Sequence, residues 1–204
     1  MKENFFKGNY GVFTHYLTVA ATTAEAWNAR TAQYDANELA KQLHEAGAKW
    51  LFFTLGQASG HFAAPNSTYD RIAGVHPSRC SKRDLVEALY EALAPYGIKL
   101  CLYMPSEAPN CPNFGWRWGK NKETDELTGD RLADFQLRWE SVIEEWSLRW
   151  GRKIAAWWVD SCYFADQMYR FADRPNFHSF AAALRAGAEP IDMEMISFCP
   201  SVIL

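Results

Sequence analysis

The sequence lacks the features that would assign it to a membrane or a secreted class. It has no apolar stretch near Met1 of the kind a secretory signal requires, and no apolar run of about 18 residues. Nor does either sign of charge dominate, because 21 Lys and Arg stand against 24 Asp and Glu, for a formal charge of -3. We therefore expect a soluble, cytoplasmic protein that binds neither membranes nor nucleic acid.

Motifs for metal, nucleotide and serine-hydrolase chemistry are also missing. No C-x-x-C pair occurs, His61, His76 and His178 have no set of carboxylate and cysteine partners that would define a metal-ligand face, and no glycine-rich phosphate loop or G-x-S-x-G motif is present. We expect no metal, no cofactor and reduced cysteines. The five cysteines are Cys80, Cys101, Cys111, Cys162 and Cys199.

Aromatic residues, by contrast, are plentiful: they make up 15% of the chain and include nine Trp. Aromatic rings either fill a core or stack against flat ligand faces, and sugars present such faces.

Strand and helix patterns alternate along the chain. Short apolar runs predict strands at 11–14, 50–55, 98–103, 154–159 and 193–198, with amphipathic helices between them. Asp35 or Asn37 is expected to cap one helix, residues 81–84 to form a capping box before another, and Pro175 to open the last. Strands that are apolar on both faces predict a parallel α/β sheet.

Two α/β architectures have this alternation, an open doubly wound sheet and a (β/α)8 barrel. Polar and aromatic residues gather just after the strands, where a barrel assembles its active site, which favours the barrel. About five strands are counted where a closed barrel needs eight. We therefore expect residues 1–204 to form a single TIM-type (β/α)8-like barrel domain that is incomplete.

Asp160 is the strongest candidate for catalysis, because it ends a wholly apolar strand. Capping a following helix is the alternative role. Glu107, in the loop after the neighbouring strand, could face Asp160 across one pocket or simply be solvated. His15 follows the first strand and could reach a bound hydroxyl, or serve as a structural histidine.

The turn at 56–62 carries Gln57 and His61 and no Lys or Arg, which favours hydrogen bonding to a neutral polyol over phosphate. The stretch 116–122 interleaves basic and aromatic residues and could stack nucleic acid, but the net charge favours a lid or a surface loop. Asn66-Ser-Thr68 matches a glycosylation sequon that we expect to be incidental.

Five groups of residues, in order along the chain, resemble motifs of the family 29 glycoside hydrolases, the retaining α-L-fucosidases. The first strand resembles the family's F-G-M-F-I-H-W-G, the fourth its W-F-D-G, and the helix start at 82–86 its K-R-D-L-V. The segments concerned are 11–15, 34–40 with 45–51, 82–86, 97–103 and 158–160.

The resemblance implies a barrel enzyme that removes a terminal neutral sugar from an oligosaccharide or glycan. It implies that Asp160 is the nucleophile, that His15 binds sugar and that Tyr103 belongs to the pocket, and we place Trp158 beside them. A retaining glycosidase also needs a second group about 5 Å away, to protonate the leaving oxygen. Glu107 is an outside candidate for this acid.

The chain departs from the family where K-H-H-D-G-F would follow the second strand. Gln57 and Ala58 replace the two sugar-binding histidines, which leaves the sugar open, although Gln57 or His61 can still bond a hydroxyl. The alternatives are a non-catalytic carbohydrate-binding relative or truncated product, and an unrelated α/β barrel enzyme. Association into a homo-oligomer also stays open.

Overall fold

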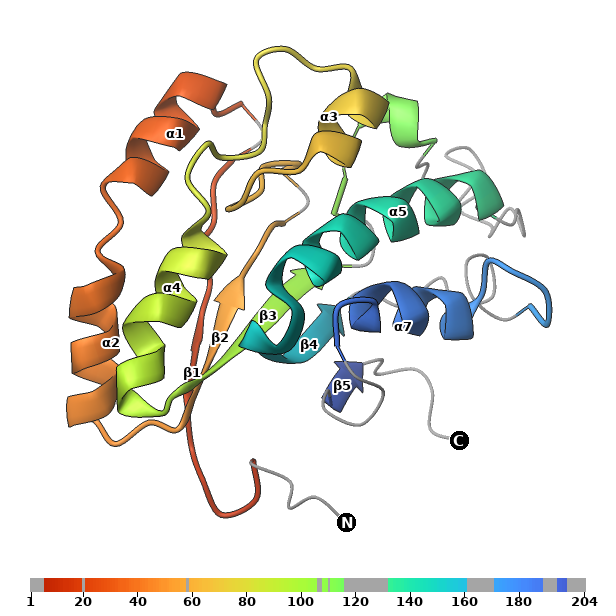
Figure 1. Cartoon of the computed structure of the whole chain (residues 1–204). Helices are drawn as coiled ribbons and strands as arrows, with labels where there is room; N and C mark the ends of the chain where they lie inside the picture. The colour runs from red at the N-terminus through yellow and green to blue at the C-terminus, as the bar shows by residue number, and fades with distance from the viewer. Residues whose placement is uncertain are drawn as a thin grey trace, which may run out of the picture.

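A computed structural model describes most of the chain as an α/β fold with a five-stranded, wholly parallel sheet (Figure 1). The strand order is the sequence order, and each of the five predicted strands is present. The strands are β1 (Val12–Thr14), β2 (Trp50–Thr54), β3 (Lys99–Pro105), β4 (Ile154–Asp160) and β5 (Glu194–Ser197). The described residues are 6–19, 21–57, 59–105, 108–109, 111–115, 132–160 and 171–188, with the backbone of 194–197.

Helices connect the strands in the described part of the chain, and none of them is long and apolar enough to cross a membrane. The α-helices are α1 (Ala24–Ala32), α2 (Ala36–Glu45), α3 (Ser67–Ala73), α4 (Leu85–Leu93), α5 (Ala133–Trp150) and α7 (Phe177–Arg185). Short 3-10 turns, η1 (Ala94–Tyr96), η2 (Pro112–Phe114) and η3 (Gly151–Lys153), complete the connections. The stretch 116–122 lies outside the described residues.

Helix caps follow the sequence signals with one correction. Asp35 caps α2, because its side chain accepts a hydrogen bond from the Glu38 amide at 2.9 Å. The capping box expected at 81–84 is wrong, because α4 begins only at Leu85 and Asp84 is itself the cap, accepting from the Glu87 amide at 2.9 Å. The Ser81 hydroxyl donates instead to the carbonyl of Arg83.

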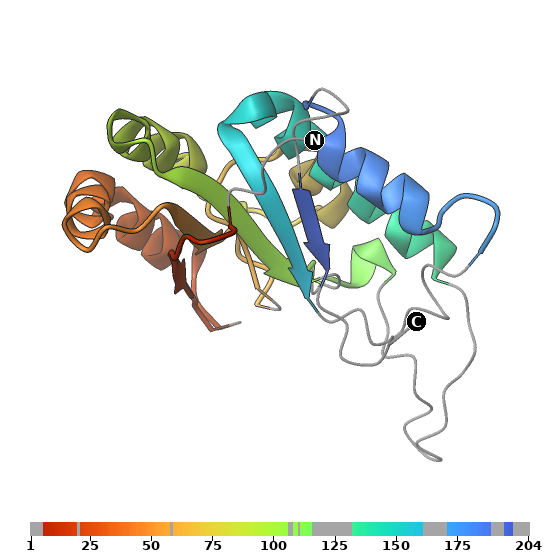
Figure 2. The ribbon, with the colours of Figure 1, turned by 90° about the horizontal axis from the view of Figure 1, so that it is seen from below.

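The two faces of the sheet differ in what covers them. Alternate strand residues point to opposite faces, and one set joins the buried helix residues in a large core, as Leu51, Leu102 and Trp157 do. The other set forms a small cluster of Phe52, Cys101 and Ala156 that includes no helix residue among those described. The helices therefore lie on one side of the arc of strands (Figure 2).

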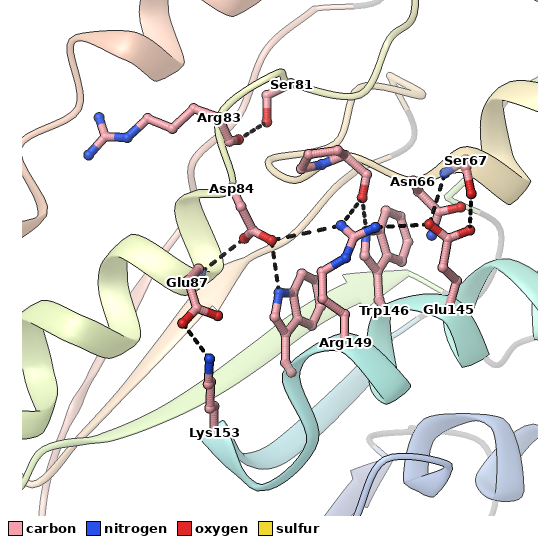
Figure 3. Close-up of polar contacts among 12 residues, drawn as sticks. Asn66, Ser67, Ser81, Arg83, Asp84, Glu87, Glu145, Trp146, Arg149 and Lys153 are labelled. Carbon is pink, nitrogen blue, oxygen red and sulfur yellow. Dashed lines mark hydrogen bonds and ion pairs between the residues drawn. The ribbon is translucent and has the colours of Figure 1, made fainter.

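A polar network ties α5 to the N-termini of α3 and α4 (Figure 3). Asp84, the cap of α4, also accepts a hydrogen bond from the Trp150 indole at 3.0 Å and faces the Arg149 guanidinium at 3.8 Å. The Glu145 carboxylate accepts bonds from the backbone amides of Ser67 and Thr68 at 2.9 and 2.7 Å. These contacts fix the position of α5 relative to α3 and α4.

Asn66, in the sequon, has a structural role. Its side chain is 1% exposed, and its Oδ1 accepts a bond from the Tyr69 amide at 2.7 Å as the cap of α3. Its Nδ2 donates to the Val142 carbonyl of α5 at 2.9 Å. A side chain held in this way is not available for glycosylation in the folded protein.

Candidate functional site

The carboxyl ends of β1, β3 and β4 bring four of the predicted site residues together. Tyr103 of β3 is paired in register with Trp158 of β4, and Pro105 with Asp160. His15 directly follows β1. Parallel strands all end at the same edge of the sheet, so residues distant in sequence converge there.

The Tyr103 hydroxyl donates a hydrogen bond to Oδ2 of Asp160 at 2.8 Å. Tyr103 is 4% exposed, and Asp160 is half-buried. A buried phenol that bonds one carboxylate oxygen restricts the rotation of the carboxylate. Asp160 is thus held in a defined orientation at the edge of the sheet.

The imidazole of His15 lies beside this pair. Its ring centroid is 5.3 Å from that of Tyr103, in an edge-to-face arrangement, and 4.4 Å from that of Phe13. His15 is exposed, so its ring nitrogens can reach a ligand from solvent.

Aromatic side chains pack against these polar groups. The Trp158 ring stacks on Phe13 at 5.4 Å and meets the edge of Phe52 at 5.6 Å. Phe13 also contacts Tyr103, at 5.1 Å between centroids. Phe13 was not predicted as a site residue, although its alternation with Val12 and Thr14 in the first strand was a signal that could have found it.

Gln57 and His61 lie on a small hairpin whose ends pair as Gly56 and Phe62. The Gln57 side chain is half-buried, and its Oε1 is buried with no hydrogen-bond partner in the structure as described. A buried acceptor without a partner costs about 1–3 kcal/mol, so this atom favours a donor from water or a ligand.

His61 is placed differently. It is 2% exposed and lies against Trp27 of α1, with ring centroids 6.0 Å apart. Burial, and secondarily the charge of Arg79, lowers the pKa of His61, which favours the neutral imidazole. Among the contacts of the described residues, none joins the His61 ring to Tyr103 or Asp160.

The second predicted carboxylate, Glu107, lies outside the described residues, as does the segment 161–170 that follows Asp160. The four residues brought together are therefore His15, Tyr103, Trp158 and Asp160. In the described part of the chain, no group of three His, Cys, Asp or Glu side chains is arranged to hold a metal ion.

A carboxylate oriented by a tyrosine, at the carboxyl edge of a parallel sheet, is the kind of site that α/β enzymes build from loops after different strands. Comparison with known protein families identifies the family to which the chain belongs. The chain belongs to the Alpha-L-fucosidase family, whose model matches residues 1–193. This confirms the resemblance seen in the sequence segments and places the chain in a family of glycosidases.

Solved structures share the fold at low sequence identity. A Bacteroides ovatus protein assigned as an alpha-L-fucosidase has a TM-score of 0.59 and 17% identity, over 92% of this chain and 30% of that chain. The family 107 endo-fucoidan hydrolase MfFcnA9 has a TM-score of 0.62 and 13% identity, over 83% and 36%. A bacterial fucosidase bound to an inhibitor has a TM-score of 0.50 and 19% identity, over 69% and 31%.

The chain thus spans about a third of the length of these proteins. A search of curated proteins found no match.

Proposed function

We propose that this chain is part of the catalytic domain of a retaining glycosidase of the alpha-L-fucosidase type, acting on a terminal neutral sugar of an oligosaccharide or glycan. The observation that carries the proposal is the Tyr103–Asp160 hydrogen bond at the carboxyl edge of the sheet, in a chain of this family.

The topology supports a (β/α)8 barrel, of which residues 1–204 would form one incomplete domain. In a doubly wound sheet the strand order reverses at a switch point, and helices cover both faces. Here the order is sequential, and every described α-helix contributes buried residues to the large core on one face. The other face carries Phe52, Cys101 and Ala156 side by side, as expected of a layer inside a barrel.

In the proposed mechanism, the Asp160 carboxylate attacks the anomeric carbon of the sugar. A bond forms between a carboxylate oxygen and this carbon as the bond to the leaving oxygen breaks, and an acid group about 5 Å away protonates that oxygen. Water, activated by the same group, then hydrolyses the glycosyl-enzyme. Tyr103 keeps Asp160 oriented for the attack, and Glu107 is the candidate acid.

Sugar hydroxyls would be bound by His15 beside Asp160 and by Gln57 on the hairpin after β2. The exposed His15 imidazole can donate or accept a hydrogen bond, and the unpartnered Oε1 of Gln57 can accept one. Trp158 presents an aromatic surface that suits the apolar face of a sugar ring.

The test is the mass of the intact chain after incubation with a 2-fluoro-fucosyl fluoride, followed by peptide mapping. Fluoride is an activated leaving group, so an adduct can form even when acid catalysis is weak. The expected result is one adduct on Asp160, which is lost in Asp160→Asn. No adduct in a folded sample would exclude fucose, and the same test with other fluoro-sugars would then separate a different sugar from a fold that only binds carbohydrate.

The alternative of a non-catalytic carbohydrate-binding relative has its own readout. Under that alternative no fluoro-sugar labels the chain, while calorimetry shows sugar binding that Asp160→Asn leaves nearly intact.

A further inference from the structure

The end of β1, from which His15 projects, has little backbone pairing. The strand is three residues long, and its ladder with β2 ends where Thr14 pairs with Phe53. In the described sheet β1 is at an edge, so β2 alone holds it. His15 is the first residue beyond the ladder, and short edge strands are prone to fraying at such points.

Two threonine side chains extend the connection between these strands. Oγ1 of Thr54 donates a hydrogen bond to the backbone carbonyl of Thr14 at 3.0 Å. Oγ1 of Thr14 in turn donates to the carbonyl of Phe52 at 3.3 Å. The Thr54 bond fixes the carbonyl of the peptide group that links Thr14 to His15.

Thr54 also lies on the strand that separates His15 from Tyr103. It pairs in register with Tyr103 of β3, and the next residue, Leu55, donates its amide to the Tyr103 carbonyl at 2.9 Å. Thr54 itself is 0% exposed. The end of β2 is therefore bonded on one side to the peptide that carries His15 and on the other to the residue that orients Asp160.

We propose that Thr54 is a positioning residue for sugar binding, because its hydroxyl fixes the peptide that directs the His15 imidazole toward the site. The side chain of His15 is exposed, and its ring contacts those of Phe13 and Tyr103, so its direction depends on the backbone at the end of β1 as well as on these two rings. The inference rests on the proposed function only in the statement that His15 contacts sugar. The placement of the His15 ring by Thr54 is testable without any ligand.

Thr31 offers a matched control for a merely structural role. It is also 0% exposed, and its hydroxyl also donates to a backbone carbonyl, that of Asn28 at 3.1 Å, but within α1. Thr31→Val and Thr54→Val thus remove the same kind of bond from two buried sites, and only the second bond adjoins His15.

The experiment is NMR of the histidine imidazoles in the full chain, with the His15 signal assigned by its loss in His15→Gln. In Thr54→Val the His15 signal is expected to shift or broaden, whereas Thr54→Ser, which keeps the hydroxyl, restores it. Thr31→Val is expected to lower the melting temperature and leave the His15 signal in place. In a titration with L-fucose, Thr54→Val is expected to raise the dissociation constant by about tenfold, and Thr54→Ser by less than about twofold.

An unchanged His15 signal in Thr54→Val, or an equal change in Thr31→Val, would overturn the inference. If Thr54→Val does not fold, Thr54→Ala, which removes the hydroxyl without placing a methyl group at its position, is judged by the same signal. If the wild-type chain does not bind fucose, the proposed sugar is wrong, while the His15 signal still decides whether Thr54 positions the ring.

Discussion

The Tyr103 hydroxyl is bonded to Oδ2 of Asp160 at 2.8 Å, and this bond joins the ends of two neighbouring strands. Tyr103 is rigidly placed, because its ring is buried and contacts those of Phe13 and His15. The carboxylate therefore takes its orientation from the sheet. A group that reacts from one defined direction benefits from such preorganisation.

Removing this hydroxyl should slow the reaction of Asp160 without unfolding the chain. Tyr103→Phe loses one hydrogen bond to a charged group, a bond worth about 1.5–3 kcal/mol, so labelling by a 2-fluoro-fucosyl fluoride should slow by roughly 10- to 100-fold. The labelling rate is read by intact mass over time. Tyr96→Phe is the control, because Tyr96 is 41% exposed and stacks on His44. Equal rates in Tyr103→Phe and the wild type would refute the role of Tyr103.

Glu145 should stabilise the fold in a pH-dependent way. Burial alone would raise the pKa of this carboxyl, but hydrogen bonds from Ser67 and Thr68 outweigh burial and hold the pKa below its usual range. Because the pKa is lower in the folded state, the stabilisation is fully present above the unfolded pKa of about 4.3 and is lost as the pH falls through the folded value.

Urea unfolding of Glu145→Gln tests this expectation. The variant should lose about 1–2 kcal/mol at neutral pH, as for other charged helix caps, and the difference from the wild type should shrink in acid. Glu144→Gln, on an exposed neighbour, is the control and should change little. If the difference in unfolding free energy between Glu145→Gln and the wild type did not vary with pH, the negative charge of Glu145 would not be what stabilises α3.

The two aspartate caps should differ in their contribution to stability. Asp35 is exposed and caps α2 with one bond, so Asp35→Ala should cost about 1 kcal/mol. Asp84 caps α4 and also bonds the Trp150 indole and faces Arg149, so Asp84→Ala should cost about 2–3 kcal/mol. Equal losses in chemical denaturation would mean that the network in Figure 3 adds nothing beyond capping.

The three described cysteines should resist alkylation in the native protein. Cys80, Cys101 and Cys111 are buried, with 3%, 0% and 5% of their surface exposed. Burial also raises the pKa of the Cys80 thiol, which disfavours the reactive thiolate. Peptide mapping after iodoacetamide should show these sites labelled only in guanidinium chloride. Rapid labelling of Cys101 in buffer would show that the sheet face it lies on opens to solvent.

Much of the fold could be predicted, because the strands are apolar runs that follow glycine-terminated helices. The run at 154–159 and the turn at Gly151 gave β4 nearly to the residue. The helix α1 was missed because it buries little: only Ala24, Trp27 and Thr31 face the core, too few to make an apolar stripe. The helix α3 was missed because it is only seven residues long and buries only Tyr69 and Ala73.

The site residues that lie at the ends of strands could be predicted from the sequence. Strand ends located His15, Tyr103, Trp158 and Asp160, which do lie together. The position of His61 could not be predicted, because it depends on a tertiary contact: the chain reverses where Gly56 lies against Phe62, so close that a Cβ on Gly56 would be 2.3 Å from that ring. The role of Thr54 was missed because side-chain bonds to a neighbouring strand leave no periodic pattern.

The alternation of residues along β3 has a consequence for how this sequence can evolve. Leu100, Leu102 and Met104 belong to the core under the helices, while Cys101 and Tyr103 belong to the opposite face. Substitutions in the first set should mainly change stability, whereas Tyr103 in the second set orients Asp160, so substitutions there should change chemistry. A single-residue deletion within β3 would move the residues beyond it to the opposite face of the sheet. It should therefore be far less tolerated there than a single substitution.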